Sequence, residues 1–267
     1  MIYFSEWLAK DHPKLYAEIT QVLDQYGEKH GLLPHTADYW CRDYMPIPLK
    51  DCSYLRYRYT PDYLVEDEDW EHITDPKPVC ETLGLHCIDT DIVLDGGNVV
   101  RCGDKVVMID KVFNENPQYE REELIAKLEA LLGAQIVWLP WDRAEEYGHS
   151  DGVVRYIEGN KVLLTNYKDY DPKMHQLFYD ELSKHFEVKE LTYSLPNSKD
   201  HSWSYINFLQ TAQVIILPKF GSHKDDEAFA QMRQHFPTYK DCIVQVDVRE
   251  IVADGGAFNC ISWLNTM

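Results

Sequence analysis

The stretch GVVRYIEGNKVLLTNYKDYDPKMHQLFYDELSKHFEVKEL, residues 152–191, contains two β-type runs, a helical pattern and a third β-type run in succession. Its Gly159-Asn160 pair is typical of the tight turn between two antiparallel strands. The predicted elements are strands Gly152–Ile157 and Lys161–Thr165, a helix from about Pro172 to His185, and strand Val188–Leu191. This stretch therefore predicts a unit of two strands, a helix and another strand.

Similar successions of β-type and helical patterns recur along the chain at a spacing of about 50 residues. The other predicted elements are a helix over Pro13–His30 closed by Gly31, a hairpin of Asp91–Val100 and Lys105–Ile109, a helix over Pro117–Leu132 capped by Asn116 and ended by Gly133, strand Gln135–Leu139, the strand pair Ser204–Leu209 and Gln213–Leu217, a helix from about Lys224 to His235, and strand Ile243–Val246. Residues 60–90 fit no regular element and predict a surface excursion. No linker interrupts residues 1–267, which favours a single α/β domain of repeated units.

The chain carries 45 acidic residues against 26 Lys and Arg residues, a formal net charge of −19. An acidic surface repels phosphate backbones and anionic bilayers, so neither nucleic acid nor a membrane is an expected partner. No apolar run reaches the roughly 18 residues of a membrane-crossing helix, and the N-terminus lacks the pattern of a signal peptide. The seven cysteines include no CxxC pair, which predicts free thiols in a reducing cytoplasm.

Two segments combine charged or glycine residues in unusual ways. In Asp38–Pro46, Arg42 and Asp43 stand together among bulky aromatic residues. Such a pair by itself is more often structural, as an ion pair that stabilises a turn, than catalytic. In Leu94–Val99, Gly96-Gly97 interrupts a β-type run, which predicts a β-bulge or a close approach of backbone or ligand, with the bulge favoured. Neither segment has the glycine spacing of a phosphate-binding loop.

Two further segments carry residues suited to acid–base and nucleophilic chemistry. In Tyr147–Gly152, His149 and Asp151 stand two residues apart at a predicted strand start, where both side chains would point to one face. A metal site is the alternative there, but no HExxH or HxH pair accompanies them. In Asp254–Ser262, Cys260 follows a glycine-rich turn that could present a reactive thiolate to a cleft.

The order of these segments resembles the agmatine deiminase and bacterial-type peptidylarginine deiminase family. The matching motifs are W-x-R-D at Trp40–Asp43, GGN at Gly96–Asn98, GHxDG at Gly148–Gly152, Tyr205–Phe208, Leu217–Gly221, and the glycine-rich segment that ends in Cys260. The resemblance covers nearly the whole chain. It implies a five-bladed α/β-propeller (pentein) fold of pseudo-repeated ββαβ units and hydrolysis of a guanidino group to a ureido group plus ammonia.

The resemblance also implies a role for each matching residue. Cys260 would be the nucleophile that forms a covalent thiouronium intermediate, and His149 the general acid and base. Asp43 and Asp151 would hold the planar guanidinium, whose paired N–H donors match carboxylates. Asp95 would line the substrate site, as would two further residues, Trp40 and Asn207. This chemistry requires no metal and no organic cofactor.

Three positions depart from the family pattern. Met45 replaces a usual Gly, and Ala257 and Asn259 replace a usual Gly and His before Cys260. Because the four reactive positions are retained, these departures predict a conserved site with an altered rim. They also predict a changed pH optimum or substrate preference, since Asn259 cannot titrate as a histidine does.

Three functions therefore remain open at this stage. The first is a deiminase acting on agmatine, a related small guanidine, or arginine in free or peptidyl form. The second is a non-catalytic relative that binds guanidines or peptides, and the third is an amidinotransferase of the same superfamily. The expected partners are a small cationic guanidino substrate or an arginine-containing peptide, and the resemblance is compatible with a homodimer.

Overall fold

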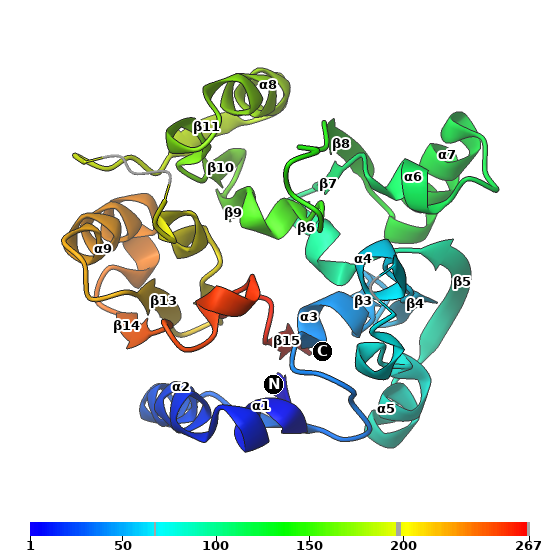
Figure 1. The fold of residues 1–267 in the computed structure, drawn as a ribbon, viewed down its shortest axis with the longest axis horizontal. Helices are drawn as coiled ribbons and strands as arrows, with labels where there is room; N and C mark the ends of the chain where they lie inside the picture. Colours follow the sequence, from blue (N-terminus) through cyan, green and yellow to red (C-terminus); the bar gives the residue numbers. More distant parts are fainter. Residues whose placement is uncertain (67, 196–198, 266–267) are drawn as a thin grey trace.

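The described strands form five sheets of three strands each, and Figure 1 shows these sheets arranged in a ring around a common centre. A computed structural model describes residues 1–66, 68–195 and 199–265 of the chain. In each sheet the inner strand is antiparallel to the middle strand, which is parallel to the outer strand. In the order inner, middle, outer, the sheets are β15-β1-β2 (Trp263–Leu264, Ile2–Ser5, His30–Leu33), β3-β4-β5 (Ile47–Pro48, Tyr54–Arg58, Cys87–Val93), β6-β7-β8 (Val100–Cys102, Lys105–Ile109, Gln135–Leu139), β9-β10-β11 (Val154–Glu158, Lys161–Leu164, Glu187–Glu190) and β12-β13-β14 (Leu209–Gln210, Ile215–Lys219, Ile243–Asp247).

Each parallel strand pair requires a crossover segment, and every crossover here contains helix. The crossover helices are α1 and α2 (Glu6–Asp11, Pro13–Gln25), α4 and α5 (Asp62–Glu66, Pro76–Leu83), α6 and α7 (Val112–Glu115, Arg121–Leu132), α8 (Pro172–Ser183) and α9 (Lys224–His235). Figure 1 shows the longer ones, α2, α5, α7, α8 and α9, on the outside of the ring. The ββαβ unit is therefore repeated five times, which confirms the predicted fold class.

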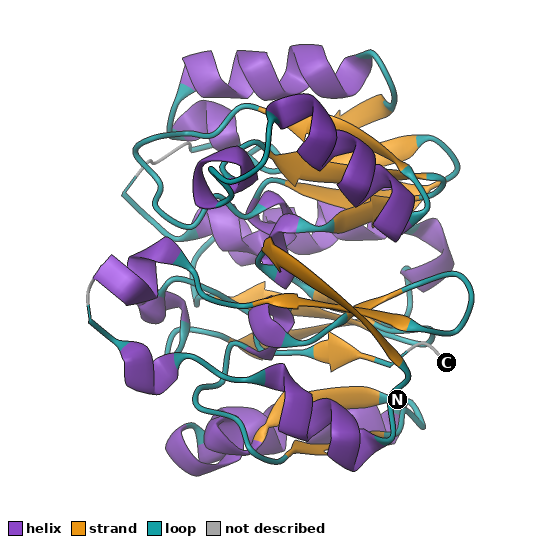
Figure 2. Cartoon of the chain, turned by 90° about the vertical axis from the view of Figure 1, so that its right-hand side faces the viewer, coloured by secondary structure: helices purple, strands orange, loops and turns teal. Residues whose placement is uncertain are grey.

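The two ends of the chain close the ring. The inner strand β15 comes from the C-terminal end and pairs antiparallel with β1, with Ile2 opposite Leu264 and Tyr3 opposite Trp263. The N-terminal ammonium group also donates a hydrogen bond of 2.8 Å to the carbonyl of Asn265. Figures 1 and 2 accordingly show the two termini close together. The first sheet thus depends on both ends of the chain.

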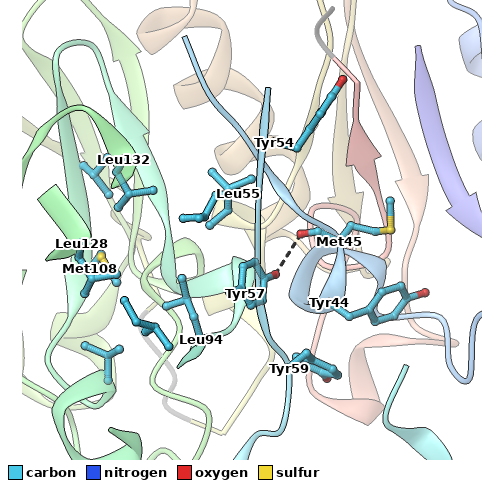
Figure 3. Close-up of a cluster of buried hydrophobic side chains, with 14 of the residues drawn as sticks. Tyr44, Met45, Tyr54, Leu55, Tyr57, Tyr59, Leu94, Met108, Leu128 and Leu132 are labelled. Atoms are coloured by element: carbon cyan, nitrogen blue, oxygen red, sulfur yellow. Dashed lines mark hydrogen bonds between the residues drawn. The ribbon is translucent and has the colours of Figure 1, made fainter. Parts of the chain in front are cut away.

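Hydrophobic side chains fill the space between neighbouring sheets. Figure 3 shows one such cluster, in which Leu55 of β4 faces Met108 of β7 and Leu128 and Leu132 of α7, while Tyr57 of the same strand points its hydroxyl away from them. All five are at most 3% exposed, and burial of each such side chain stabilises the fold by about 1.5–3 kcal/mol relative to exposure. The cluster contains side chains from two neighbouring sheets, so it holds these sheets, and the segment that connects them, in fixed relative positions.

Several predicted elements have the observed bounds or nearly so. The strand Gln135–Leu139 and the helix Lys224–His235 are confirmed residue for residue as β8 and α9. The hairpin around Gly159-Asn160 is confirmed, as is the helix that begins at Pro172. None of the described helices combines the length and hydrophobicity needed to cross a membrane.

Two predicted helices extend too far toward neighbouring elements. The first ends at Gln25, because Gly27 adopts a φ of 69° and the chain then enters β2 at His30. The second begins at Arg121, and Asn116 does not cap it. The Asn116 side chain instead forms two hydrogen bonds of 2.8 Å with the backbone of Val93, which joins α6 to β5.

Three predicted segments were wrong. Two of them contain a 3₁₀ turn that connects two sheets, and the third contains the helices of a crossover. The run Asp91–Val100 is divided between β5 and β6 by a turn at Gly96–Asn98. Half of the predicted strand Ser204–Leu209 lies in the turn Ser202–Ile206. Residues 60–90 contain α4, α5 and the turn Trp70–His72, and buried side chains of α5 contribute to the core.

Candidate active site

The predicted site residues lie in the five segments that connect the outer strand of one sheet to the inner strand of the next. These positions are Asp43 in the short helix α3 (Cys41–Tyr44), Asp95 just before the turn η2 (Gly96–Asn98), His149 and Asp151 at the turn η3 (Ser150–Gly152), Asn207 just after the turn η5 (Ser202–Ile206), and Cys260 shortly before β15. Because the ring repeats, equivalent segments of all five units meet near its centre. The fold therefore brings together side chains that are far apart in sequence.

Asn207 holds the segment that carries Cys260. Its side-chain oxygen accepts hydrogen bonds of 3.1–3.2 Å from the backbone N–H groups of Ala257, Asn259 and Cys260. Its side-chain nitrogen donates to the Cys260 sulfur at 3.1 Å. Asn207 thus orients the thiol directly and orders the turn that presents it.

Asp151 lies beside the thiol. One carboxylate oxygen, Oδ2, accepts a 2.6 Å hydrogen bond from the Asn259 side chain and a 3.5 Å bond from Asn207. The Cys260 sulfur is 3.7 Å from the same oxygen. Asn259, one of the three departures from the family pattern, therefore contacts the proposed guanidinium-binding carboxylate.

His149 lies between two other carboxylates. Its Nε2 atom is 2.8 Å from Asp95 Oδ2, and its Nδ1 atom is 3.6 Å from Asp43 Oδ1. Asp43 Oδ1 also accepts a 3.0 Å hydrogen bond from the Gly97 N–H. Asp95 Oδ2 accepts a further bond, at 3.3 Å, from the hydroxyl of Tyr63. His149 and Asp151 lie at a 3₁₀ turn and not on the predicted strand, and they contact different partners.

The glycines of the GGN motif are required by close approach, and the favoured prediction of a simple bulge was wrong. A Cβ atom on Gly96 would lie 2.1 Å from the Arg42 carbonyl oxygen. One on Gly97 would lie 2.6 Å from Asp43 Oδ1 and 2.8 Å from His149 Nδ1. The third residue, Asn98, forms hydrogen bonds of 2.7 and 3.0 Å with the Ile109 backbone. The motif thus allows two reactive side chains to pack against a fixed turn.

Burial and neighbouring charges shift the pKa values of the site. Burial lowers the pKa of His149, but the carboxylates of Asp43, Asp95 and Asp151 outweigh burial and raise it to about 10. Burial raises the pKa of Asp43 to about 8, although His149 opposes this shift. Burial, together with Asp151 and Asp43, also raises the pKa of the Cys260 thiol well above its usual value. At neutral pH these shifts favour protonated His149 and the thiol form of Cys260.

A cavity of about 190 Å³ gives access to three of these groups, namely Asp43, His149 and Cys260. We call it the site cavity. Its other lining residues are four acids (Asp38, Asp69, Glu146, Asp254), four aromatic residues (Trp40, Tyr59, Tyr63, Tyr147), Leu64, Gly255 and Gly256. Among the described lining residues there is no Lys or Arg. The cavity therefore suits a cation.

The seven predicted site residues do not all line this cavity. Trp40 does, and it packs so closely on Gly256 that a Cβ there would lie 2.3 Å from its ring. Asp95, Asp151 and Asn207 are buried behind the lining and contact the residues that reach it. The departures Met45 and Ala257 are also buried outside the lining, so neither alters the rim as predicted.

Sequence reasoning missed Tyr63, and for the acidic run at residues 66–71, which contains Asp69, it favoured a solvated loop over a part of the site rim. Tyr63 of α4 lines the site cavity and donates its hydroxyl to Asp95, and Asp69 lines the same cavity. The position of α4 is set by Lys111, a 1% exposed lysine whose Nζ lies 2.6 Å from Asp62. No motif marks Tyr63, because its role depends on how α4 packs over the ring.

A metal site, the alternative for His149 and Asp151, would need several ligands around one point. In residues 1–66, 68–195 and 199–265, no group of three or more His, Cys, Asp or Glu side chains is arranged to hold a metal ion. His149 and Asp151 have different partners, as described above, so the metal alternative finds no ligand set among these residues.

Solved structures with the same fold define the class of protein. An agmatine deiminase of Enterococcus faecalis aligns with a TM-score of 0.78 at 20% identity, covering 98% of this chain and 92% of that chain. The DDAH (dimethylarginine dimethylaminohydrolase) of Pseudomonas aeruginosa, solved with citrulline, aligns with a TM-score of 0.58 at 14% identity. This alignment covers 98% of this chain and 97% of that chain. The five-unit ring is thus the pentein fold of these structures.

The sequence comparisons identify the family within that class. The model of the Porphyromonas-type peptidyl-arginine deiminases matches residues 10–264, and the chain belongs to this family. Two curated relatives carry the name "Putative agmatine deiminase". The relative from Legionella pneumophila (strain Paris) is 30% identical over 192 residues, which cover 64% of this chain but only 55% of the relative. The relative from Selenomonas ruminantium is 25% identical over 287 residues, which cover 87% of this chain and 75% of the relative.

Proposed function

We propose that this protein hydrolyses the guanidino group of a small guanidino amine, such as agmatine, to a ureido group and ammonia. One observation carries the proposal: the Cys260 thiol, the His149 imidazole and the Asp43 carboxylate all reach one small cavity whose other ionisable lining residues are acids or tyrosines. Family membership supports the same reaction class.

Substrate capture depends on charge. A guanidinium has paired N–H donors in a plane, and carboxylates accept them as strong charge-assisted hydrogen bonds. Asp43 lines the cavity, and Asp151 is 3.7 Å from the Cys260 sulfur, so the two carboxylates flank the position of attack. The positive charge of the substrate lowers the pKa values of Asp43 and Cys260, which burial and neighbouring carboxylates raise, and therefore favours the charged form of both groups.

The reaction proceeds in two stages. When the guanidinium is bound, the Cys260 thiol releases its proton to solvent, and the thiolate attacks the central guanidinium carbon to form a neutral tetrahedral adduct. Protonated His149 donates a proton to one amino group, the C–N bond breaks, ammonia leaves and a thiouronium cation remains on sulfur. Neutral His149 then accepts a proton from water, whose oxygen attacks the same carbon. The C–S bond breaks, which releases the ureido product, a proton and the thiolate.

The lining of the cavity favours a cationic tail on the substrate. Asp38, Asp69, Glu146 and Asp254 lie around the guanidinium-binding groups, and no Lys or Arg among the described lining residues could pair with a carboxylate. The α-carboxylate of free arginine would be repelled, whereas an alkylamine would be attracted. The volume of 190 Å³ is below the roughly 300–1,000 Å³ of pockets for larger ligands, which disfavours a peptide.

The test compares three guanidines under identical conditions. Ammonia and ureido product are measured with agmatine, free arginine and a blocked arginine peptide, and we expect agmatine to give the highest kcat/KM. Cys260→Ala should abolish turnover, whereas the control Cys242→Ala, which removes a half-buried thiol outside the cavity, should retain it.

Three outcomes would contradict the proposal. Turnover that survives in Cys260→Ala would exclude the covalent mechanism. Agmatine binding without turnover in the unaltered protein would indicate a binding relative. Transfer of the amidino group to an added amine, which gives a new guanidine and no ureido product, would indicate an amidinotransferase.

A further inference from the structure

A second and larger cavity, of about 610 Å³, lies along the inner strands of the ring. We call it the inner-strand cavity. Its lining includes residues from all five inner strands: Ile47 and Pro48 of β3, Val100 and Arg101 of β6, Arg155 and Tyr156 of β9, Gln210 of β12, and Trp263 and Leu264 of β15. The described linings of the two cavities share no residue. The inner-strand cavity is therefore a separate potential binding site.

The charge of this cavity is opposite to that of the site cavity. Its lining contains Arg42, Lys50, Arg101 and Arg155 but only one acid, Asp151. The chain as a whole has 45 acidic residues against 26 basic ones, so a local excess of cations is unexpected by composition. None of the three arginines forms an ion pair within 4.0 Å in the part of the chain that the structure describes.

Two of the four cations already have a structural role. Arg101 donates a 2.9 Å hydrogen bond to the carbonyl of Leu132, and Lys50 lies 3.4 Å from the carbonyl of Gly133. Both carbonyls are at the C-terminal end of α7, where cations stabilise the helix dipole. Arg42 and Arg155 are therefore the main candidates for binding a ligand.

The guanidinium groups of Arg42 and Arg155 retain unused donors. Arg42 Nε donates to the Asn259 carbonyl at 3.3 Å, and Arg155 Nη1 donates to the Phe208 carbonyl at 2.8 Å. Each guanidinium has five N–H donors, so most of them remain for another acceptor. The Arg155 guanidinium also lies 4.3 Å from the centre of the Phe208 ring, which fixes its plane.

The electrostatic environment of Arg155 also favours an anion. Burial lowers its pKa to about 10, and the positive charge of Arg42 acts in the same direction, whereas Asp151 only partly opposes them. An oxyanion would offset this penalty and could accept paired hydrogen bonds from a planar guanidinium. The apolar wall that includes Met45, Ile47 and Trp263 would contact the carbon skeleton of such a ligand.

We propose that the inner-strand cavity binds an organic oxyanion, a carboxylate or a phosphate ester, whose charged group is held by Arg42 and Arg155. This proposal does not rest on the deiminase reaction, since the ligand has the opposite charge and a different cavity, although Asp151 and Asn259 of the candidate active site also line that cavity. Its failure would leave the proposed function unaffected.

Calorimetric titration at constant ionic strength tests the proposal with three probes: phenyl phosphate, benzoate and inorganic phosphate. We expect at least one organic probe to bind more tightly than inorganic phosphate, because only it contacts the apolar wall. Arg155→Gln should weaken its binding at least tenfold, and Arg155→Lys should weaken it less, since lysine keeps the charge but not the planar fork. The control Arg233→Gln, on the exposed face of α9, should bind normally.

A second pair of variants avoids any effect on folding. Ala212 is exposed and lines the inner-strand cavity, so Ala212→Glu should abolish binding and Ala212→Lys should strengthen it. The control Ala144→Glu adds the same charge at an exposed position outside the cavity. The proposal is wrong if none of the three probes binds, or if Ala212→Glu and Ala144→Glu bind alike. The arginines would then serve only to balance the buried carboxylates.

Discussion

Substitution of Gly97 by alanine tests directly whether the close packing of the η2 turn positions the reactive groups. The new methyl group would lie 2.6 Å from Asp43 Oδ1 and 2.8 Å from His149 Nδ1, where ordinary contacts begin at 3.4 Å. Asp43 must therefore move by about 0.8 Å and His149 by about 0.6 Å, which are the differences between these distances. A misplacement of roughly 1 Å can cost about 10²-fold in rate, so we expect kcat/KM for agmatine to fall by about that factor.

The assay measures ammonia release and the melting temperature in parallel. Gly152→Ala is the matched control, because Gly152 ends the equivalent turn η3 and a Cβ there meets nothing within 4 Å. The control should retain activity and gain or lose little stability. The reasoning is refuted if Gly97→Ala stays within twofold of the unaltered protein, or if both alanine variants lose activity equally.

Two further predictions concern stability. In the folded protein the pKa of Asp43 is about 8, compared with an ordinary value of 3.8, and the pKa of His149 is about 10, compared with 6.5. Between the ordinary and the raised value of each group, the folded protein therefore binds more protons than the unfolded chain. The free energy of unfolding should therefore fall as pH rises from 5 to 9, and less steeply in Asp43→Asn, as measured by denaturant titration. Asn207→Ala leaves three buried N–H groups without their acceptor. Each such group costs about 1–3 kcal/mol, so the free energy of unfolding should fall by about 3 kcal/mol or more. The control Asn114→Ala, at an exposed position, should change the free energy of unfolding little.

Each of these predictions has a contradicting result. A pH dependence that is the same in Asp43→Asn and the unaltered protein would show that the Asp43 carboxyl does not titrate abnormally. Equal stabilities of Asn207→Ala and Asn114→Ala would show that water or another group replaces the lost acceptor.

The repeated unit was predictable because its elements are governed by local rules. The turn pair Gly159-Asn160 and the apolar run of β8 depend on neighbours close in sequence, and both are observed as predicted. The segments between the sheets were not predictable in this way. The 3₁₀ turns at Gly96–Asn98 and Ser202–Ile206 contain residues that also suit a strand, and packing at the centre of the ring decides their conformation.

The sequence by itself determined the repeated α/β architecture and the family, and it supplied the candidate site residues, because periodicity and motifs are local properties. Only the tertiary structure decided which groups share a cavity, why Gly96 and Gly97 must be glycines, and that Tyr63 and Asp69 belong to the site. It also separated the acidic site cavity from the basic inner-strand cavity, a contrast that the net charge of −19 conceals. The physical reason is closure of the ring, which turns five distant segments into neighbours whose burial and charges then act on one another.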